Sequence, residues 1–454
     1  MPGALTLESL AEAVATGGID TVVAAQIDMQ GRLMGKRFHA AHFLETAHRG
    51  THGCNYLLAT DLEMATVEGY AATSWAQGYG DYVMRPDLST LRRTPWAEGT
   101  ALVLCDTLDH HGEHEIAHAP RTVLKRQCAR LAERGWTANA ASELEFFLFR
   151  QSFEQAEAQG FAGLETFSAY NEDYHVLQSF KAEPLMRAVR NALHGADVPV
   201  ENTKGEADAG QQELNVVYAD ALSMADRHVV AKSAVKEIAW SQGRAVTFMA
   251  KWSDRHAGSS CHVHLSLADA AGAPLFPDPA GPDGMSPTMR AFLAGLLAHA
   301  GEIAPFLAPY VNSYKRFVPG AFAPTRLVWS PDNRTAGFRV VGEGTPALRV
   351  ECRVGGGDLT PHLAFAALIA AGLAGVERGL ELEPAAAGDA YAGAGREIPR
   401  TLRDAAAALD RSETMRAAFG DAVIDHYLRA FAWEQEVADA RVTDLDLKRG
   451  FERA

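Results

Sequence analysis

The chain has 454 residues, 47% of them apolar and 22% charged, and its formal net charge is −15. This length allows two or more domains with sizeable cores, and the acidic balance argues against a nucleic-acid backbone or an anionic membrane as the main partner. Five cysteines without a CxxC pair, and an N-terminus without a signal-peptide pattern, favour a reducing, cytoplasmic location.

The first part of the chain carries mainly strand signals. Residues 6–17 predict a short amphipathic helix, residues 21–38 a hairpin, residues 83–96 a proline-bounded loop and residues 101–108 a strand. The histidine-rich stretch HHGEHEIAHAP (110–120) is typical of a solvated linker, with a metal-binding tract as the alternative. We therefore expect a domain boundary near residue 115.

The second part alternates helices with strands. Pro120 and Gly135 bound a helical pattern, which the apolar strand ASELEFFLFR (141–150) follows. Longer helical patterns cover 220–242, 287–304, 361–380 and 421–440. The run at 362–376 is too short and too interrupted by glycine to span a membrane, so it predicts a buried helix.

Four β-prone stretches carry charged or histidine side chains at alternate positions, which places those side chains on one face of each strand. A solvated polar face explains any one of these strands, but if the four share one curved sheet, their polar faces converge. The stretches are ASELEFFLFR (141–150), GQQELNVVY (210–218), SSCHVHLSL (259–267) and LRVECRV (348–354). The converging residues are Glu143, Glu145, Glu206 just upstream of the second stretch, Glu213, His262, His264, Ser266, Arg349, Glu351 and Arg353.

Carboxylates that are buried side by side require a neutralising partner. Five glutamates with one imidazole form an oxygen-rich set that suits Mg²⁺ or Mn²⁺ better than zinc or copper, and they are numerous enough for two or more ions. A zinc site at Cys261-His262 is the rival, and it lacks a second cysteine at ligand spacing.

A basic region follows between residues 312 and 340. The guanidinium of arginine binds carboxylate and phosphate groups with two parallel hydrogen bonds. Metal ions beside arginines therefore match phosphoryl-transfer chemistry. A surface basic loop is the alternative, and aromatic neighbours such as Phe317 and Phe338 argue for partial burial. Neither GxxxxGK[ST] nor GxGxxG occurs. The basic residues are Lys315, Arg316, Arg326, Arg334 and Arg339.

Seven segments in this order resemble the glutamine synthetase family: ELEFF, KGE…GQQE, GSSCHVHLSL, NSYKRFVPG, NRTAGFR, ECRVGGGD and LAFAALIAAGL. The resemblance implies an α+β fold, with a small N-terminal β-grasp domain (17–112) and a catalytic domain (117–454) whose antiparallel strands form half a funnel backed by helices. It also implies a homododecamer of two stacked hexameric rings, with active sites between neighbouring subunits, and ATP as cosubstrate.

The resemblance further implies a role for each matching residue. Glu145, Glu206 and Glu213 match the first metal site, and Glu143, His262 and Glu351 match the second. Arg316 and Arg353, with the Gly258 backbone, match the glutamate clamp. Arg334 and Arg339 match the phosphate-facing, catalytic arginines. Tyr218, His264, Ser266 and Arg349, together with Arg334, match positions around ATP.

The departures from the family pattern concern the ammonium site. Members that make glutamine carry a glutamate just before Ala-Pro in the loop after VPG, and here Phe322 takes that place. They also carry a DGSS segment, whereas this chain has ATDLEMATVEG (59–69). Asp61, Glu63 or Glu68 can replace the missing acids, and Glu63 is the candidate for taking the proton of the amine. The family's adenylylated tyrosine has no clear match, since the comparable stretch around Tyr391 reads DAYAGAG.

An aromatic wall formed by Phe322 favours an amine with a carbon substituent over ammonium. The sequence is similar to the branch that joins glutamate to ethanolamine or other organic amines. It therefore predicts an ATP-dependent ligase that makes a γ-glutamyl amide through a γ-glutamyl phosphate. The alternatives are an ordinary glutamine synthetase, a catalytically inactive homologue and a two-metal hydrolase.

Overall fold

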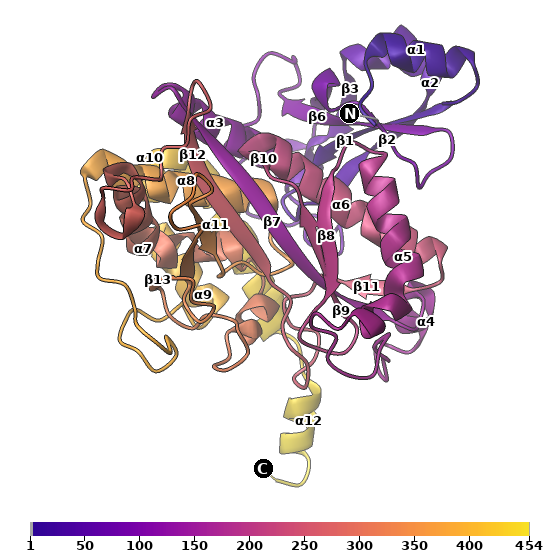
Figure 1. The fold of residues 1–454 in the computed structure, drawn as a ribbon. Coiled ribbons are helices and arrows are strands. Elements are labelled where there is room, and N and C mark those ends of the chain that lie inside the picture. The colour runs from indigo at the N-terminus through magenta and orange to yellow at the C-terminus, as the bar shows by residue number, and fades with distance from the viewer. Residues whose placement is uncertain (1–2, 454) are drawn as a thin grey trace.

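The computed structural model describes residues 3–453 and consists of two sheets with their helices (Figure 1). The N-terminal sheet has the order β2-β1-β6-β4-β3, with β5 paired to β6. Strand β1 runs parallel to β6 and antiparallel to β2. The strands are β1 (Thr21–Ile27), β2 (Leu33–His39), β3 (Thr51–Cys54), β4 (Asp81–Pro86), β5 (Arg92–Arg93) and β6 (Thr100–Leu108).

Alternation along β1 gives the N-terminal sheet two buried faces. Val22 packs with Phe43 of helix α2 (Ala40–Glu45) and Leu10 of helix α1 (Leu7–Ala15) in a small core. Its neighbours Val23 and Ala25 belong to the main core of the protein instead. One face of the sheet therefore carries its own helices, and the other face docks onto the rest of the chain.

The predictions for this part are mostly confirmed. The hairpin at 21–38, the first helix and the strand at 101–108 are present. The predicted loop at 83–96 is wrong in part, because β4 pairs with β6 through residues 83–86 and buries Tyr82 and Met84. Pro86 ends that strand rather than excluding it, since proline is tolerated at strand ends.

The second sheet, which is the predicted catalytic sheet, has the order β13-β14-β15-β12-β7-β9-β8, with β10 and β11 also paired to β7. The long strands β7 and β12 cross the middle of the molecule in Figure 1. Its strands are β7 (Trp136–Phe149), β8 (Val200–Gly205), β9 (Gln211–Val216), β10 (Ala219–Asp220), β11 (Ala245–Thr247), β12 (Cys261–Asp269), β13 (Trp329–Pro331), β14 (Phe338–Val341) and β15 (Arg349–Cys352). This α+β architecture confirms the predicted fold class.

Helices cover the back of this sheet, where Leu144, Phe146 and Leu148 of β7 enter the main core. Because successive strand residues point to opposite faces, Glu143 and Glu145 lie on the front. The long helices are α3 (Pro120–Ala132), α5 (Val176–His194), α6 (Ala221–Ser241), α7 (Pro287–Leu307), α8 (Pro361–Arg378) and α11 (Asp421–Asp439). Shorter ones are α4 (Phe153–Ala158), α9 (Leu402–Asp410), α10 (Glu413–Phe419) and α12 (Asp444–Gly450), which projects away from the body (Figure 1).

Helix α8, the predicted buried helix, lies against α7 at the centre of the core. A Cβ atom added to Gly375 would lie 2.1 Å from the Ala291 carbonyl oxygen, so this crossing requires glycine. In residues 3–453, no helix is long and apolar enough to cross a membrane.

The two sheets meet around a buried arginine at the start of α3. The Arg121 guanidinium donates to Asp226 of α6 (3.0 Å to Oδ2) and to Asp87 of the N-terminal part (2.6 Å to Oδ2). The first part of the histidine-rich stretch, residues 110–114, is mostly exposed, but His118 is largely covered, because its ring stacks on His426 with centroids 3.9 Å apart. The chain passes between the sheets here, and the predicted boundaries 17–112 and 117–454 stay predictions.

Candidate active site

Strand register brings the predicted polar residues together on the front of the catalytic sheet. Glu145 pairs with Glu213 across β7 and β9, and Glu143 pairs with His262 across β7 and β12. His264 and Arg339 each pair with Glu351 from opposite sides of β15. The polar faces of the four predicted strands therefore converge, and the alternative of four separate solvated faces is wrong.

The first cluster contains Glu145, Glu206 and Glu213, whose ligand oxygens all lie within 4.8 Å of one another. Glu145 and Glu213 are buried, and the Glu145 carboxylate accepts hydrogen bonds from the Ser260 N–H (2.7 Å) and the Gln211 side-chain amide (3.1 Å). Burial and the nearby charge of Glu206 raise the pKa of Glu213 to about 9 and that of Glu145 to about 7.

Lys204 is the cation that contacts this cluster, through the Glu206 carboxylate. One ammonium group does not balance three carboxylates, and their repulsion adds to the effect of burial, which is the largest cause of the raised pKa values of Glu213 and Glu145. A divalent cation placed among the three oxygens would neutralise them, and a hard, all-oxygen donor set suits Mg²⁺ or Mn²⁺. The residues present therefore fit a metal ion.

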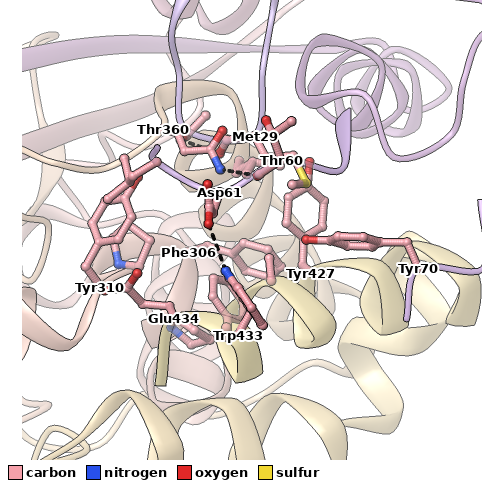
Figure 2. A pocket seen from close by; sticks show the side chains of 17 residues that line it. Met29, Thr60, Asp61, Tyr70, Phe306, Tyr310, Thr360, Tyr427, Trp433 and Glu434 are labelled. Carbon is pink, nitrogen blue, oxygen red and sulfur yellow. Dashed lines mark hydrogen bonds between the residues drawn. The ribbon is translucent and has the colours of Figure 1, made fainter. Parts of the chain in front are cut away.

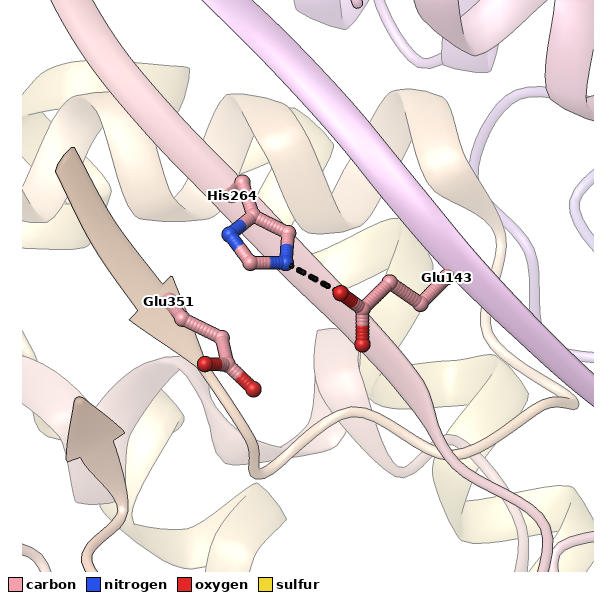
Figure 3. A group of neighbouring side chains, drawn as sticks. All are labelled: Glu143, His264 and Glu351. Carbon is pink, nitrogen blue, oxygen red and sulfur yellow. Dashed lines mark hydrogen bonds and ion pairs between the residues drawn. The ribbon is translucent and has the colours of Figure 1, made fainter. Parts of the chain in front are cut away.

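The second cluster contains Glu143, His264 and Glu351, again with ligand atoms within 4.8 Å (Figure 3). His262 lies beside the same two carboxylates, with Nδ1 2.9 Å from Glu143 Oε2 and 3.6 Å from Glu351 Oε1. Burial alone would raise the pKa of Glu143, but its hydrogen bonds with the two histidines hold that pKa well below its ordinary value.

The two histidines differ in what their ring nitrogens contact. His264 Nδ1 accepts a hydrogen bond from Arg349 Nε (3.1 Å), so its proton belongs on Nε2, which lies 2.8 Å from Glu143 Oε1. The lone pair on His264 Nδ1 therefore accepts from Arg349 and is not available to a metal ion. His262 Nδ1 instead faces both carboxylates, and this geometry favours His262 over His264 as the metal ligand.

Arginines flank the second cluster. Arg339 Nη1 donates to Glu351 Oε2 (2.9 Å), and Arg353 contacts the other oxygen of the same carboxylate. Burial raises the pKa of Glu351, but the charges of His262 and Arg353 more than offset this and lower it. Arg353 also donates to the backbone carbonyl of Arg334 (3.2 Å), whose own side chain is exposed.

Arg316 has a different environment from the one that the sequence predicts. Its side chain is 1% exposed, and its guanidinium donates to Ser260 Oγ (3.1 Å) and to the carbonyls of Val354 (2.5 Å) and Gly355 (3.0 Å). A Cβ atom on Gly258 would lie 2.3 Å from Arg316 Cγ, so glycine is needed there for packing. In this arrangement Arg316 supports the backbone next to Arg353, and direct glutamate binding by Arg316 and Gly258 stays a prediction.

A cavity of about 590 Å³ adjoins the second cluster and reaches from β7 to β15. Tyr218, His264, Ser266 and Arg349 line it, as the predicted nucleotide site requires, together with Glu143. Asn139, Asn202 and Asn215 also line this cavity, and the sequence reasoning missed them because amides on strands are not distinctive. It also missed Lys204, although the KGE segment places that lysine two residues before Glu206.

Most of the predicted amine-side residues are exposed in the single chain. Phe322 is 59% exposed at a positive φ of 54°, and its carbonyl accepts from Arg353 (3.4 Å). Glu63 and Glu68 are exposed on the N-terminal loop. Asp61 is not a free acid, because its oxygens accept from the Ala65 N–H (2.8 Å) and the Trp433 indole (3.0 Å; Figure 2). Asp61 therefore holds the loop against α11.

Comparisons with known proteins agree with this geometry. The family model described as glutamine synthetase, catalytic domain, matches residues 117–450. A Streptomyces coelicolor protein named gamma-glutamylethanolamide synthetase is 49% identical over 450 residues, covering 99% of this chain and 96% of that protein. A Pseudomonas protein named glutamate–isopropylamine ligase is 35% identical over 435 residues, covering 95% of each. The solved structure of GmaS without ligand matches with a TM-score of 0.83 at 28% identity, covering 98% of this chain and 99% of that one.

The fold and the site together define a protein whose nine-stranded sheet carries two carboxylate-rich clusters beside several arginines. With the family model matching 334 of its residues (117–450), this chain belongs to the glutamine synthetase family. The resemblance seen in the sequence is thus confirmed.

Proposed function

We propose that the protein joins the γ-carboxyl group of glutamate to an organic amine at the expense of ATP. The carboxylate oxygen attacks the γ-phosphorus, the bond to the β-phosphate oxygen breaks, and ADP leaves. The amine nitrogen then attacks the resulting acyl phosphate, phosphate leaves, and the nitrogen loses a proton. The observation that carries this proposal is Phe322 in the loop beside Arg353, where an ammonium site would need an acid.

Two or more Mg²⁺ or Mn²⁺ ions are part of the proposal. Glu145, Glu206 and Glu213 would hold one ion, and Glu143, His262 and Glu351 another. When bound, such ions neutralise the charge of the triphosphate, which otherwise repels an attacking carboxylate. The raised pKa values of Glu145 and Glu213 support this assignment, because burial and the charge of Glu206 destabilise their ionised forms, which a metal ion would stabilise.

The chain's own side chains would position the reactants. Tyr218, His264, Ser266 and Arg349 would bind ATP in the cavity of about 590 Å³, whereas the exposed Arg334 would reach the phosphates from its loop. Arg353, with support from Arg316 and the Gly258 backbone, would hold the carboxylate of glutamate. Arg339 would stabilise the charge on the transferring phosphoryl group, because its guanidinium already lies at the metal-binding Glu351.

The amine would bind against Phe322, with Glu63 of a neighbouring subunit as the group that takes its proton. The exposure of both residues in the single chain supports active sites shared between subunits, and a homododecamer is the assembly that the family implies. An ethanolamine-like amine, another monoamine or a polyamine fits an aromatic wall better than ammonium does. Five free cysteines, with no disulfide, suit a reducing cytoplasmic compartment.

The test is glutamate-dependent phosphate release from ATP with Mg²⁺ or Mn²⁺, over a panel of ammonium, ethanolamine, short alkylamines, putrescine, spermidine and aniline. Products are identified by mass. Turnover with an organic amine well above that with ammonium supports the proposal. A preference for ammonium would identify a glutamine synthetase whose ammonium-binding acids lie elsewhere in the sequence. The absence of phosphate release with every amine would favour an inactive homologue.

A further inference from the structure

A second large cavity lies behind the catalytic sheet. Its volume is about 550 Å³, and its walls come from the turn after β1, from α6 and from β11 with the residues that follow. Phe248 in that wall packs on Phe146 of β7, with ring centroids 5.1 Å apart. Phe146 points away from the face that carries Glu145, so the cavity and the metal clusters lie on opposite faces of the sheet.

Two lysines converge on one ring in this cavity. The ammonium groups of Lys232 and Lys236 lie 5.4 and 5.8 Å from the centroid of Phe248. The Lys232 ammonium donates to the Gly357 carbonyl (2.8 Å), and among the ion pairs of residues 3–453 neither lysine has a carboxylate partner. Burial, together with their mutual repulsion, lowers the pKa of Lys232 to about 8. Asp358 attracts Lys232, and Asp28 attracts both lysines, but in residues 3–453 no carboxylate contacts either ammonium group directly. Both ammonium groups are therefore free to contact an anionic group of a ligand.

Acidic groups line the same cavity. Asp358 accepts from Ser313 Oγ (2.7 Å) through Oδ2, while its Oδ1 is buried without a hydrogen-bond partner. Glu434 of α11 lines it as well, and burial raises the pKa of both carboxyl groups. A ligand with negative charge alone would be repelled by these groups, and one with positive charge alone would be repelled by the lysines.

Lysines, acids and an apolar wall around one cavity point to a zwitterion. We propose that this cavity binds a small α-amino acid, with its carboxylate at Lys232 and Lys236, its ammonium toward Asp358 and Glu434, and its side chain against Phe248 and Met249. The site goes beyond the proposed ligase reaction and does not depend on it.

Arg32 connects this cavity to the loop that carries Glu63. Its guanidinium lines the cavity, pairs with Asp28 (2.6 Å) and donates to the carbonyls of Leu62 (2.8 Å) and Asp61 (3.2 Å). A smaller adjoining cavity shares Gln30, Leu62, Tyr310 and Glu434 with it (Figure 2). An amino acid bound here would therefore stabilise the position of the 61–63 loop. Its effect on the amine side of a neighbouring active site, unlike the binding itself, rests on the proposed role of Glu63.

The test is calorimetric titration of the full-length protein, without nucleotide, metal or glutamate. L-Alanine and L-methionine are the probes, and propionate, ethylamine and inorganic phosphate are the comparison compounds. The variants are Lys236→Gln, which removes a positive charge from the proposed carboxylate-binding end of the cavity, and Glu434→Gln, which removes a negative charge from the proposed ammonium-binding end. Lys448→Gln, on the exposed helix α12, is the matched control. Circular dichroism and Tm verify that each variant is folded.

We expect an amino acid to bind the wild-type protein and Lys448→Gln with a Kd of about 1 mM or tighter. Affinity should fall about tenfold or more in each of the two cavity variants, and propionate, ethylamine and phosphate should bind about tenfold more weakly than the amino acid. Since the cavity lies behind the sheet, Lys236→Gln does not alter the glutamate site. Equal affinity in the wild type and Lys236→Gln, equal binding of propionate, or no amino-acid binding would overturn the assignment.

Discussion

Arg349 and His264 are joined by a hydrogen bond of 3.1 Å from Nε of the arginine to Nδ1 of the imidazole. This bond fixes the proton of His264 on the nitrogen that faces Glu143, 2.8 Å away. Arg349, which lines the cavity of the proposed nucleotide site, thereby orients a carboxylate of the second cluster through His264. We therefore predict that nucleotide binding and metal binding are coupled through this imidazole.

Arg349→Gln should weaken both kinds of binding, because His264 loses the partner that fixes its tautomer. We expect Mn²⁺ affinity at the second cluster to fall about tenfold or more, the usual effect of removing a residue that orients a ligand. Titration of Mn²⁺ by electron paramagnetic resonance without ATP measures this directly. Arg255→Gln, a change of equal charge at an exposed position, is the control. Unchanged Mn²⁺ affinity in Arg349→Gln would show that the coupling is absent.

The raised pKa of Glu213, about 9, predicts an unusual pH dependence of stability for the metal-free protein. A carboxyl group whose folded-state pKa lies above its unfolded value of 4.5 binds more protons in the folded state, so stability falls as pH rises between 4.5 and 9. We expect the Tm in EDTA to decrease over this range and the decrease to be smaller in Glu213→Gln. At pH 8 in EDTA, the Tm of Glu213→Gln should also be higher than that of the wild type, by roughly 2 °C for each kcal/mol by which the substitution increases the free energy of unfolding.

Metal ions should reverse the order of thermal stability of the wild type and Glu213→Gln. With saturating Mn²⁺ the wild type should be the more stable protein, because Glu213→Gln has lost a charged ligand of the first cluster. Thermal melts at pH 8, with and without Mn²⁺, compare the two proteins under matched conditions. If Glu213→Gln is the less stable protein in EDTA as well, the three carboxylates are not held together against their repulsion.

Arg339→Ala should damage turnover far more than substrate binding. Its guanidinium lies at Glu351 and is proposed to stabilise charge that develops on the transferring phosphoryl group. We expect kcat to fall by about 10²-fold or more while the KM for glutamate changes by less than about threefold. Lys315→Ala, an exposed residue of the same basic region, should leave both parameters close to wild type. Comparable losses in kcat and KM would assign Arg339 to glutamate binding instead.

Phe322→Glu should shift the acceptor preference toward ammonium. The substitution restores a carboxylate beside Arg353, and the high exposure of Phe322 means that folding is little affected. We expect the ratio of kcat/KM for ammonium to that for the preferred organic amine to rise about tenfold or more. Phe322→Gly separates loss of the ring from gain of the acid, and relieves the positive φ of 54°. A preference that stays the same in both variants would place the amine elsewhere.

Much of the site could be predicted because it depends on local alternation. Glu143 and Glu145 had to share a face once their segment was a strand, and the registers with Glu213 and His262 then completed the clusters. The long helices were predictable from their periodicity and their bounding prolines and glycines. Helix α5 was missed, since it contains Pro184, which the surrounding packing accommodates.

What could not be predicted depends on contacts between distant segments. Asp61 has the chemistry of a replacement acid, but its carboxylate accepts from Trp433, 372 positions away. Arg316 has the chemistry of a substrate clamp, but its guanidinium is buried against carbonyls of residues 353–355. In both cases the residue type indicates what the side chain can do, and only the tertiary structure shows what it contacts.

The central claim is that ATP activates the γ-carboxyl group of glutamate for attack by an organic amine. Glutamate labelled with ¹⁸O in its γ-carboxyl group, incubated with ATP, Mg²⁺ and ethanolamine or the best amine of the panel, tests this step by mass spectrometry of both products. The account predicts one ¹⁸O atom in each phosphate released, in amounts equal to the γ-glutamyl amide formed. Unlabelled phosphate would show that water attacks ATP instead, as in a two-metal hydrolase, and would contradict the account.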